Sequence, residues 1–112
     1  MSTNVAMLNS VWNVDHLGRD LSISMTKCRS NSTSIIAITE TGGIGSVFDA
    51  NSLGVDCYLG SRGNGIPEAF ARSLPTVLKS EHVLLTLALR EIDSEVVQAL
   101  IGSIRSRSDS LK

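Results

Sequence analysis

The stretch His82–Ile104, HVLLTLALREIDSEVVQALIGSI, decides the fold that we expect for this chain. It opens with an apolar run over residues 83–89, and both alternating faces of this run are largely apolar. That pattern predicts a strand covered on both sides. Asp93 then suits a helix N-cap, because its carboxylate can accept hydrogen bonds from the free N–H groups of the first turn. A stripe at helical spacing follows, formed by Val96, Val97, Leu100, Ile101 and Ile104.

A buried strand followed by an amphipathic helix needs other strands beside it, and residues 20–60 are expected to supply them. Residues 21–26 alternate between apolar and hydroxyl side chains, which predicts a half-exposed strand. Further short strands are predicted at 35–39, 46–49 and 55–59. Between the first two of these lies the segment Thr41–Gly45, whose three glycines in four positions allow positive φ and predict a tight hairpin.

The two ends of the chain and the helix near Pro67 show a less regular hydrophobic pattern. Residues Met7–Val14 suggest a first strand, and a helix is expected to begin near Pro67, where a missing N–H costs little. Pro75 lies well inside that helix and should kink or split it. The predicted fold is α+β, with an antiparallel sheet of about five to six strands flanked by two main helices. We expect one domain over residues 1–105 and a disordered tail over residues 106–112.

Composition excludes several classes of partner. The chain has 112 residues and a net charge of −1 with both signs interspersed, so neither nucleic acid nor an anionic membrane is an expected partner. Its aromatic content of only 4% also argues against base stacking. The N-terminus lacks a signal-peptide core, and no apolar run is long enough to span a bilayer. We therefore expect a cytoplasmic or nuclear protein.

No arrangement of residues that would support catalysis is visible. His16 and His82 belong to no ligand motif, and the spacing of Cys28 and Cys57 matches no zinc or redox site, so buried free thiols are expected. The loop Gly60–Gly65 follows a strand and precedes a helix, as a phosphate loop does, but it lacks the Gly-Lys-Ser/Thr ending. A connecting loop is the favoured interpretation. We expect no enzyme activity, no cofactor and no metal, and binding rather than catalysis.

Four segments in colinear order carry a family resemblance. The strand IIAITE (35–40) leads into TGGIGSVF (41–48), CYLG (57–60) precedes a loop and Pro67, the helical segment Phe70–Leu74 follows, and VLLTLALRE (83–91) leads into a helix with Glu95. This order resembles the proteasome assembly chaperone 3 family. The resemblance implies a non-enzymatic α+β protein that dimerises with itself or with a sister small chaperone. Such a dimer helps to assemble the α-subunit ring of the 20S core particle and leaves before the mature particle forms.

The chain departs from the family pattern in three places. Residues 1–19 do not align, the loop at 63–65 is slightly longer, and Pro75 interrupts a helix that the family is expected to keep continuous. If that helix forms the dimer contact, Pro75 alters the geometry of pairing.

Two sets of residues are the candidate contacts. The predicted binding site for α subunits comprises Thr41, Gly42, Gly43, Ile44 and Gly45 together with Gly60, Ser61, Arg62, Gly63, Asn64 and Gly65, with Arg62 as a polar anchor. The predicted dimer strip comprises Phe70, Leu74, Val97, Leu100 and Ile101, for which the alternative is the monomer core. Two other functions stay open. One is a trafficking or signalling scaffold of roadblock or longin type, and the other is a small ligand-binding or enzymatic domain that uses the Gly60–Gly65 loop.

Overall fold

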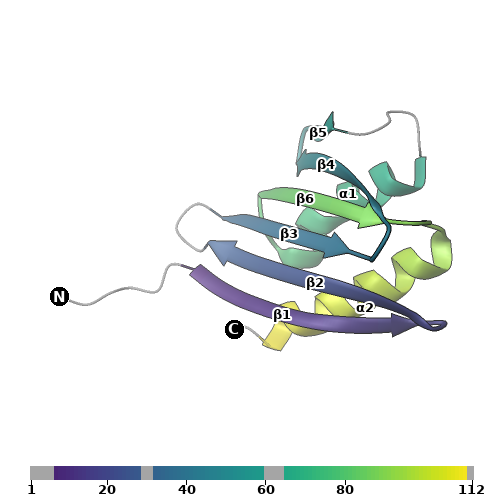
Figure 1. Ribbon diagram of the computed structural model, residues 1–112. Coiled ribbons are helices and arrows are strands. Elements are labelled where there is room, and N and C mark those ends of the chain that lie inside the picture. Colours follow the sequence, from purple (N-terminus) through teal and green to yellow (C-terminus); the bar gives the residue numbers. More distant parts are fainter. Residues whose placement is uncertain (1–6, 29–31, 60–64, 111–112) are drawn as a thin grey trace.

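Six strands and two helices form the fold of this computed structural model, which describes residues 7–28, 32–59 and 65–110 (Figure 1). In chain order the elements are β1 (Met7–His16), β2 (Arg19–Cys28), β3 (Thr33–Thr39), β4 (Ile44–Asn51), β5 (Gly54–Leu59), α1 (Gly65–Leu78), β6 (His82–Leu89) and α2 (Ser94–Ser110). The strands form one sheet in the order β1-β2-β3-β6-β4-β5. The predicted α+β class is therefore confirmed, and the predicted first strand exists.

The sheet differs from the predicted one at its centre. Strand β6 lies between β3 and β4, parallel to the first and antiparallel to the second. The predicted hairpin between residues 35–39 and 46–49 is therefore wrong, since β3 and β4 are not neighbours. The glycines of the connection do allow a sharp bend. However, the most apolar strand of the chain occupies the middle of the sheet, where hydrogen-bonded strands cover both of its edges.

A true hairpin joins β1 to β2. The two-residue loop Leu17-Gly18 has positive φ at both positions, 53° and 82°, as a type I′ turn requires. Asp15 accepts a hydrogen bond from the backbone N–H of Gly18 through Oδ1 at 3.1 Å. The paired register runs without interruption from His16↔Arg19 to Met7↔Cys28.

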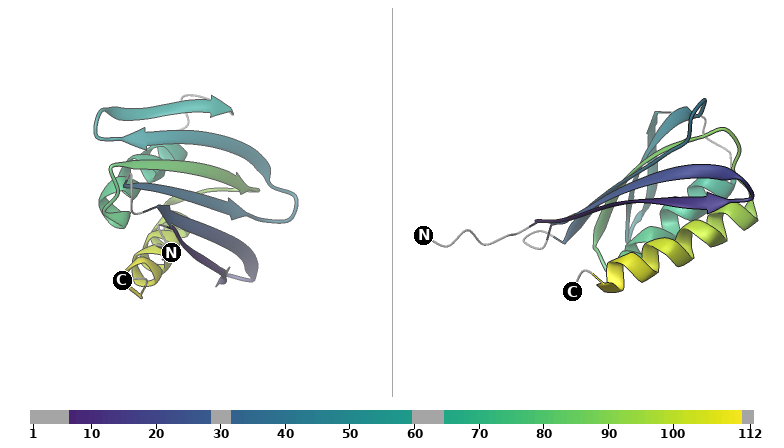
Figure 2. Two further views of the ribbon diagram at one scale, coloured as in Figure 1. Left: turned by 90° about the vertical axis from the view of Figure 1, so that its left-hand side faces the viewer. Right: turned by 60° about the horizontal axis from the view of Figure 1, so that its bottom comes forward.

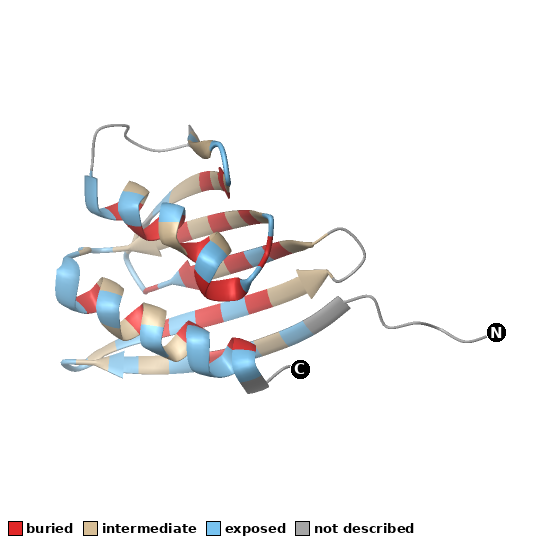
Figure 3. Ribbon diagram, turned by 180° about the vertical axis from the view of Figure 1, so that it is seen from behind, coloured by how far each residue is buried: buried red, intermediate tan, exposed pale blue. Residues whose placement is uncertain are grey.

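Both helices cover the same face of the sheet, as the views in Figure 2 and Figure 3 show. The prediction that residues 83–89 are covered on both sides is therefore wrong. Val83, Leu85 and Leu87 are buried under the helices, whereas Leu84 and its neighbours on the opposite face are half-buried among adjacent strands only. The core lies between the helices and the sheet and includes Trp12, Leu21, Ile23, Met25, Ile36, Ile38, Phe48, Phe70, Leu74, Leu78, Val96, Leu100 and Ile104.

Helix α1 is more regular than expected, and helix α2 is longer than expected. Helix α1 runs through Pro75 to Leu78, so this proline does not split it. Lys79, at φ 54°, ends the helix, and the N–H of Ser80 donates to the carbonyl of Pro75 at 3.0 Å, which is the Schellman arrangement. Helix α2 continues to Ser110, which corrects the expected tail for residues 106–110. Ser108 is buried there and accepts a hydrogen bond from Lys27 Nζ at 3.0 Å.

Candidate interaction surfaces

The sheet face opposite the helices is not covered by any helix among the described residues, and it faces the viewer in Figure 1. We call it the open face. Strand alternation places one residue in two on it. Two of its apolar side chains are well exposed, Val11 at 73% and Ile35 at 46%. Its members include Asn9, Val11, Asn13, Asp15, Asp20, Ser22, Ser24, Thr26, Ile35, Ala37, Thr39, Val47, Asp49, Asp56, His82, Leu84, Thr86 and Ala88.

Charge on the open face lies near two of its borders. His82 on β6 and Asp49 on β4 form an ion pair at one border, and Asp56 on β5 lies opposite Asp49 in the strand register. At another border the exposed Asp20 of β2 lies opposite Asp15 of β1. The open-face residues that β2 and β3 contribute between these borders are apolar or carry hydroxyl groups. An uncharged area of small, apolar and hydroxyl side chains with charge at its rim is typical of surfaces that bind another protein.

The predicted contact turn, Thr41–Gly45, lies at the end of the sheet where β6 finishes. An alanine Cβ at Gly43 would lie 2.1 Å from the carbonyl oxygen of Ala88, so only glycine fits this close approach. The backbone N–H of Glu40 donates to that same carbonyl at 2.9 Å. The backbone carbonyl of Glu40 in turn accepts a hydrogen bond from the N–H of Gly43 at 2.9 Å. The turn is thereby fixed to the sheet, while Thr41 and Gly42 remain exposed.

A buried carboxylate holds this end of the molecule together. The Glu40 side chain is 3% exposed and accepts hydrogen bonds from Arg19 Nε at 2.9 Å and Arg19 Nη2 at 2.7 Å. It also accepts from the backbone N–H of Arg90 at 3.0 Å and from the Arg90 guanidinium at 3.1 and 3.2 Å. Hydrogen bonding from Arg19, followed by that from Arg90, lowers the pKa of Glu40 from 4.5 to about 2. The cluster joins the start of β2, the end of β3 and the connection from β6 to α2.

The second predicted contact segment is only partly visible. Residues 60–64, including Arg62, lie outside the described residues, so the anchor role of Arg62 stays a prediction. Gly65 begins α1 and is exposed. The registers Ile44↔Leu89 and Val47↔Leu59 place the Thr41–Gly43 turn and the end of β5 at the same end of the sheet.

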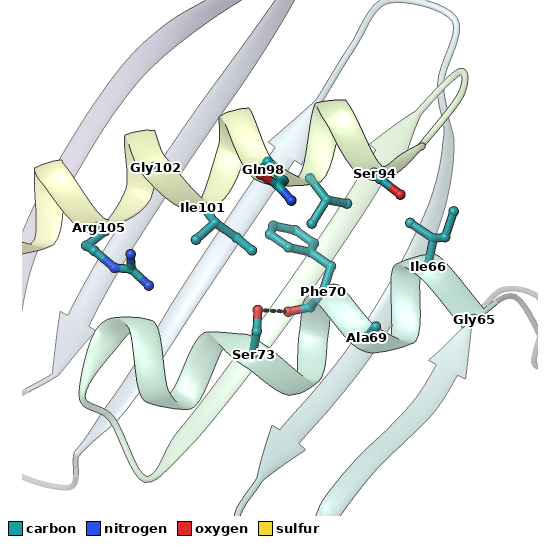
Figure 4. A pocket seen from close by; sticks show the side chains of 11 residues that line it. Gly65, Ile66, Ala69, Phe70, Ser73, Ser94, Gln98, Ile101, Gly102 and Arg105 are labelled. Atoms are coloured by element: carbon teal, nitrogen blue, oxygen red, sulfur yellow. Dashed lines mark hydrogen bonds between the residues drawn. The ribbon is translucent and has the colours of Figure 1, made fainter.

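The predicted dimer strip divides into two groups. Phe70, Leu74 and Leu100 are at most 1% exposed and belong to the monomer core, so the core explains why these three are apolar. Val97 and Ile101 are half-buried and line a groove between α1 and α2, shown in Figure 4. The groove has a volume of about 540 Å³ and is also lined by Ile66, Ala69, Phe70, Ser73, Gln98, Gly102 and Arg105.

No group of three or more His, Cys, Asp or Glu side chains among the described residues is arranged to hold a metal ion. Cys28 and Cys57 are both half-buried rather than buried as expected. Within the part of the chain that the structure describes, neither helix is long and apolar enough to cross a membrane.

Comparison with known proteins does not assign the chain to a family. No protein-family model matches the chain, and a search of curated proteins finds none with significant similarity.

Proposed function

We propose that this chain is a non-catalytic assembly chaperone that binds proteasome α subunits and assists formation of the α ring of the 20S core particle, acting as a homodimer or as a heterodimer with a second small chaperone. Two observations support this proposal. The colinear segments described above resemble the proteasome assembly chaperone 3 family, and the fold offers a surface suited to a protein partner.

The observation that carries the proposal is the open face. A six-stranded sheet whose helices all lie on one side must leave its other side to solvent or to another protein. Here that side presents Val11 and Ile35 to solvent, and apart from Asp20 at the start of β2 the strands β2 and β3 contribute no charged side chain to it. Because the strands are backed by a packed core, a partner would bind a preformed surface and little ordering would be needed on binding.

The fixed turn at Thr41–Gly43 gives this surface a defined border. Its attachment to Ala88 and to the Glu40 cluster keeps the backbone beside the open face in one position. Transient shielding of a subunit face requires a surface of defined shape that releases its partner later, and a face whose middle carries small, apolar and hydroxyl side chains meets that requirement.

The test is a tagged pull-down from native cytosol, with mass spectrometry of the bound proteins. The proposal predicts recovery of proteasome α subunits without mature β subunits. Reproducible absence of α subunits, together with recovery of another defined complex, would overturn it.

The same observation supports one alternative, a trafficking or signalling scaffold of roadblock or longin type, since such scaffolds also combine a sheet with helices. The pull-down separates the two functions, because a scaffold of this kind would recover membrane-trafficking components instead. The ligand-binding alternative is tested by thermal shift with nucleotides and anions, since a ligand that binds only the folded state raises its stability.

A further inference from the structure

The free edge of β1 is the least protected backbone surface among the described strands. Edge strands usually carry lysine, proline or a bulge that prevents pairing with another chain. The opposite edge strand, β5, is short at six residues, carries the exposed Asp56 and pairs with β4 through a register irregularity at Val47/Phe48. β1 is ten residues long, contains no lysine, arginine or proline, and pairs with β2 without any irregularity.

The hairpin geometry shows which backbone groups of β1 are unpaired. In a two-residue hairpin the residues that flank the loop form a hydrogen-bonded pair, here His16 and Arg19. Every second residue before His16 therefore bonds to β2, and the residues between them point N–H and C=O away from the sheet. These outward residues are Met7, Asn9, Val11, Asn13 and Asp15.

We infer that the β1 edge pairs with the β1 edge of a second copy of this chain, antiparallel and with the two-fold axis at Val11. In this register Val11 pairs with its own symmetry mate, and Asn9 pairs with Asn13 of the other copy. Both members of each pair are outward residues, so the whole set of outward groups finds partners. Axes at neighbouring positions leave some of these groups unpaired, because the strands then overlap over a shorter length.

Side-chain hydrogen bonding on the open face favours the same register. Asn13 already donates its amide group to Asp20 Oδ1 at 2.9 Å, so its carbonyl oxygen remains available. Asn9 already accepts a hydrogen bond from Thr26 Oγ1, so its amide donors remain available. The amide of Asn9 in one copy is therefore complementary to the carbonyl of Asn13 in the other, on both sides of the Val11 pair.

Charge and layer arrangement are compatible with this pairing. The one carboxylate of β1, Asp15, falls opposite the backbone of Met7 and not opposite a second carboxylate. A two-fold axis perpendicular to the sheet keeps the helices of both copies on one side. The two open faces would then join into one continuous surface. This inference goes beyond the proposed function, which leaves the pairing surface unassigned, and it does not depend on the identity of the partner.

The first experiment compares the full chain with Val11→Pro and Val11→Thr by sedimentation velocity over a concentration series. Proline removes an outward N–H that β2 does not use, so each monomer keeps its hairpin while the central hydrogen bonds between copies are lost. Threonine keeps both the N–H and the β-branched shape. We expect wild type and Val11→Thr to dimerise alike, and Val11→Pro to dissociate with a Kd raised about tenfold or more. Circular dichroism checks that Val11→Pro still folds.

The second experiment is independent of that variant. Hydrogen-bonded antiparallel partners have Cα atoms about 5.5 Å apart, a separation that a disulfide can span. Val11→Cys should therefore form a disulfide between the introduced thiols of two copies under mild oxidation, whereas wild type, with only Cys28 and Cys57, should not. A monomer throughout the series, a dimer unaffected by Val11→Pro, or linkage of the introduced thiol only to Cys28 or Cys57 would each overturn the inference.

Discussion

Replacing Glu40 by glutamine should destabilise the fold in a manner that depends on pH. The carboxylate is 3% exposed and receives hydrogen bonds from both Arg19 and Arg90. Glutamine keeps the volume of the side chain. However, it removes the negative charge and replaces one acceptor oxygen by an amide that faces arginine donors, leaving those donors without a partner.

The magnitude of the destabilisation follows from the pKa of Glu40. Lowering the pKa of Glu40 from 4.5 in the unfolded chain to about 2 in the folded protein corresponds to about 3 kcal/mol, at about 1.36 kcal/mol for each pH unit. The Arg90 side chain is 58% exposed, so solvent screens part of this interaction, and we expect about 2 kcal/mol at neutral pH. For a chain of this size, that lowers the Tm by about 10 °C.

The sign of the pH dependence follows from the same lowering of the Glu40 pKa. Above pH 4.5 the carboxylate is ionised in both states, and its full stabilisation is present. As the pH falls from 4.5 towards about 2, the unfolded chain takes up the proton first, so this stabilisation is progressively lost. The difference between wild type and Glu40→Gln should therefore be largest near neutral pH and shrink across that acidic range.

The assay is urea unfolding followed by the fluorescence of Trp12, the single tryptophan, at pH values from neutral to about 3. Glu91→Gln serves as the control, because Glu91 is exposed and its bond to Arg19 uses the backbone carbonyl. That variant should change stability by less than about 0.5 kcal/mol. A difference between wild type and Glu40→Gln that stays constant down to pH 3 would refute the electrostatic reasoning.

Three further predictions concern packing. Gly43→Ala should cost about 2 kcal/mol, because its Cβ would meet the carbonyl of Ala88 at 2.1 Å, whereas Gly45→Ala, with nothing within 4 Å, should change thermal stability little. Leu85→Ala should lower the free energy of unfolding in urea by about 2–5 kcal/mol, and Leu84→Ala should lower it clearly less. Equal losses for the two variants would contradict an arrangement in which the helices cover only one face of the sheet. Trp12→Phe should lower thermal stability by about 1 kcal/mol, because it loses the indole hydrogen bond of 2.7 Å to α2.

The sequence was most informative where local signals and tertiary packing agree. Asp93 caps α2 as expected, accepting from the N–H of Val96 at 2.9 Å. The apolar stripe of α2 faces the core through Val96, Leu100 and Ile104. Both features depend on residues close together in the chain, and so they are readable from spacing alone.

The features that the sequence did not reveal depend on distant residues. Glycines in the 41–45 segment predicted a bend correctly, but nothing local to them shows that β6 enters between the two strands they connect. The apolar alternate positions of β6 suggested a second covering layer that the described residues do not contain, because half-buried Leu84 and a fully buried residue look alike in sequence. The Glu40 cluster was missed because its arginines lie 21 and 50 positions away.

One comparison tests most directly whether the open face binds α subunits. Ile35→Glu places a charge at the centre of that face, where the native side chain is 46% exposed. Leu53→Glu makes the same kind of change at a residue that is 95% exposed in the β4–β5 turn and does not belong to the open face. Both variants should fold, and both are compared with wild type by quantitative pull-down. We predict that Ile35→Glu lowers recovery of proteasome α subunits by about tenfold while Leu53→Glu retains it. Equal recovery with both variants would contradict the assignment of the open face as the binding surface.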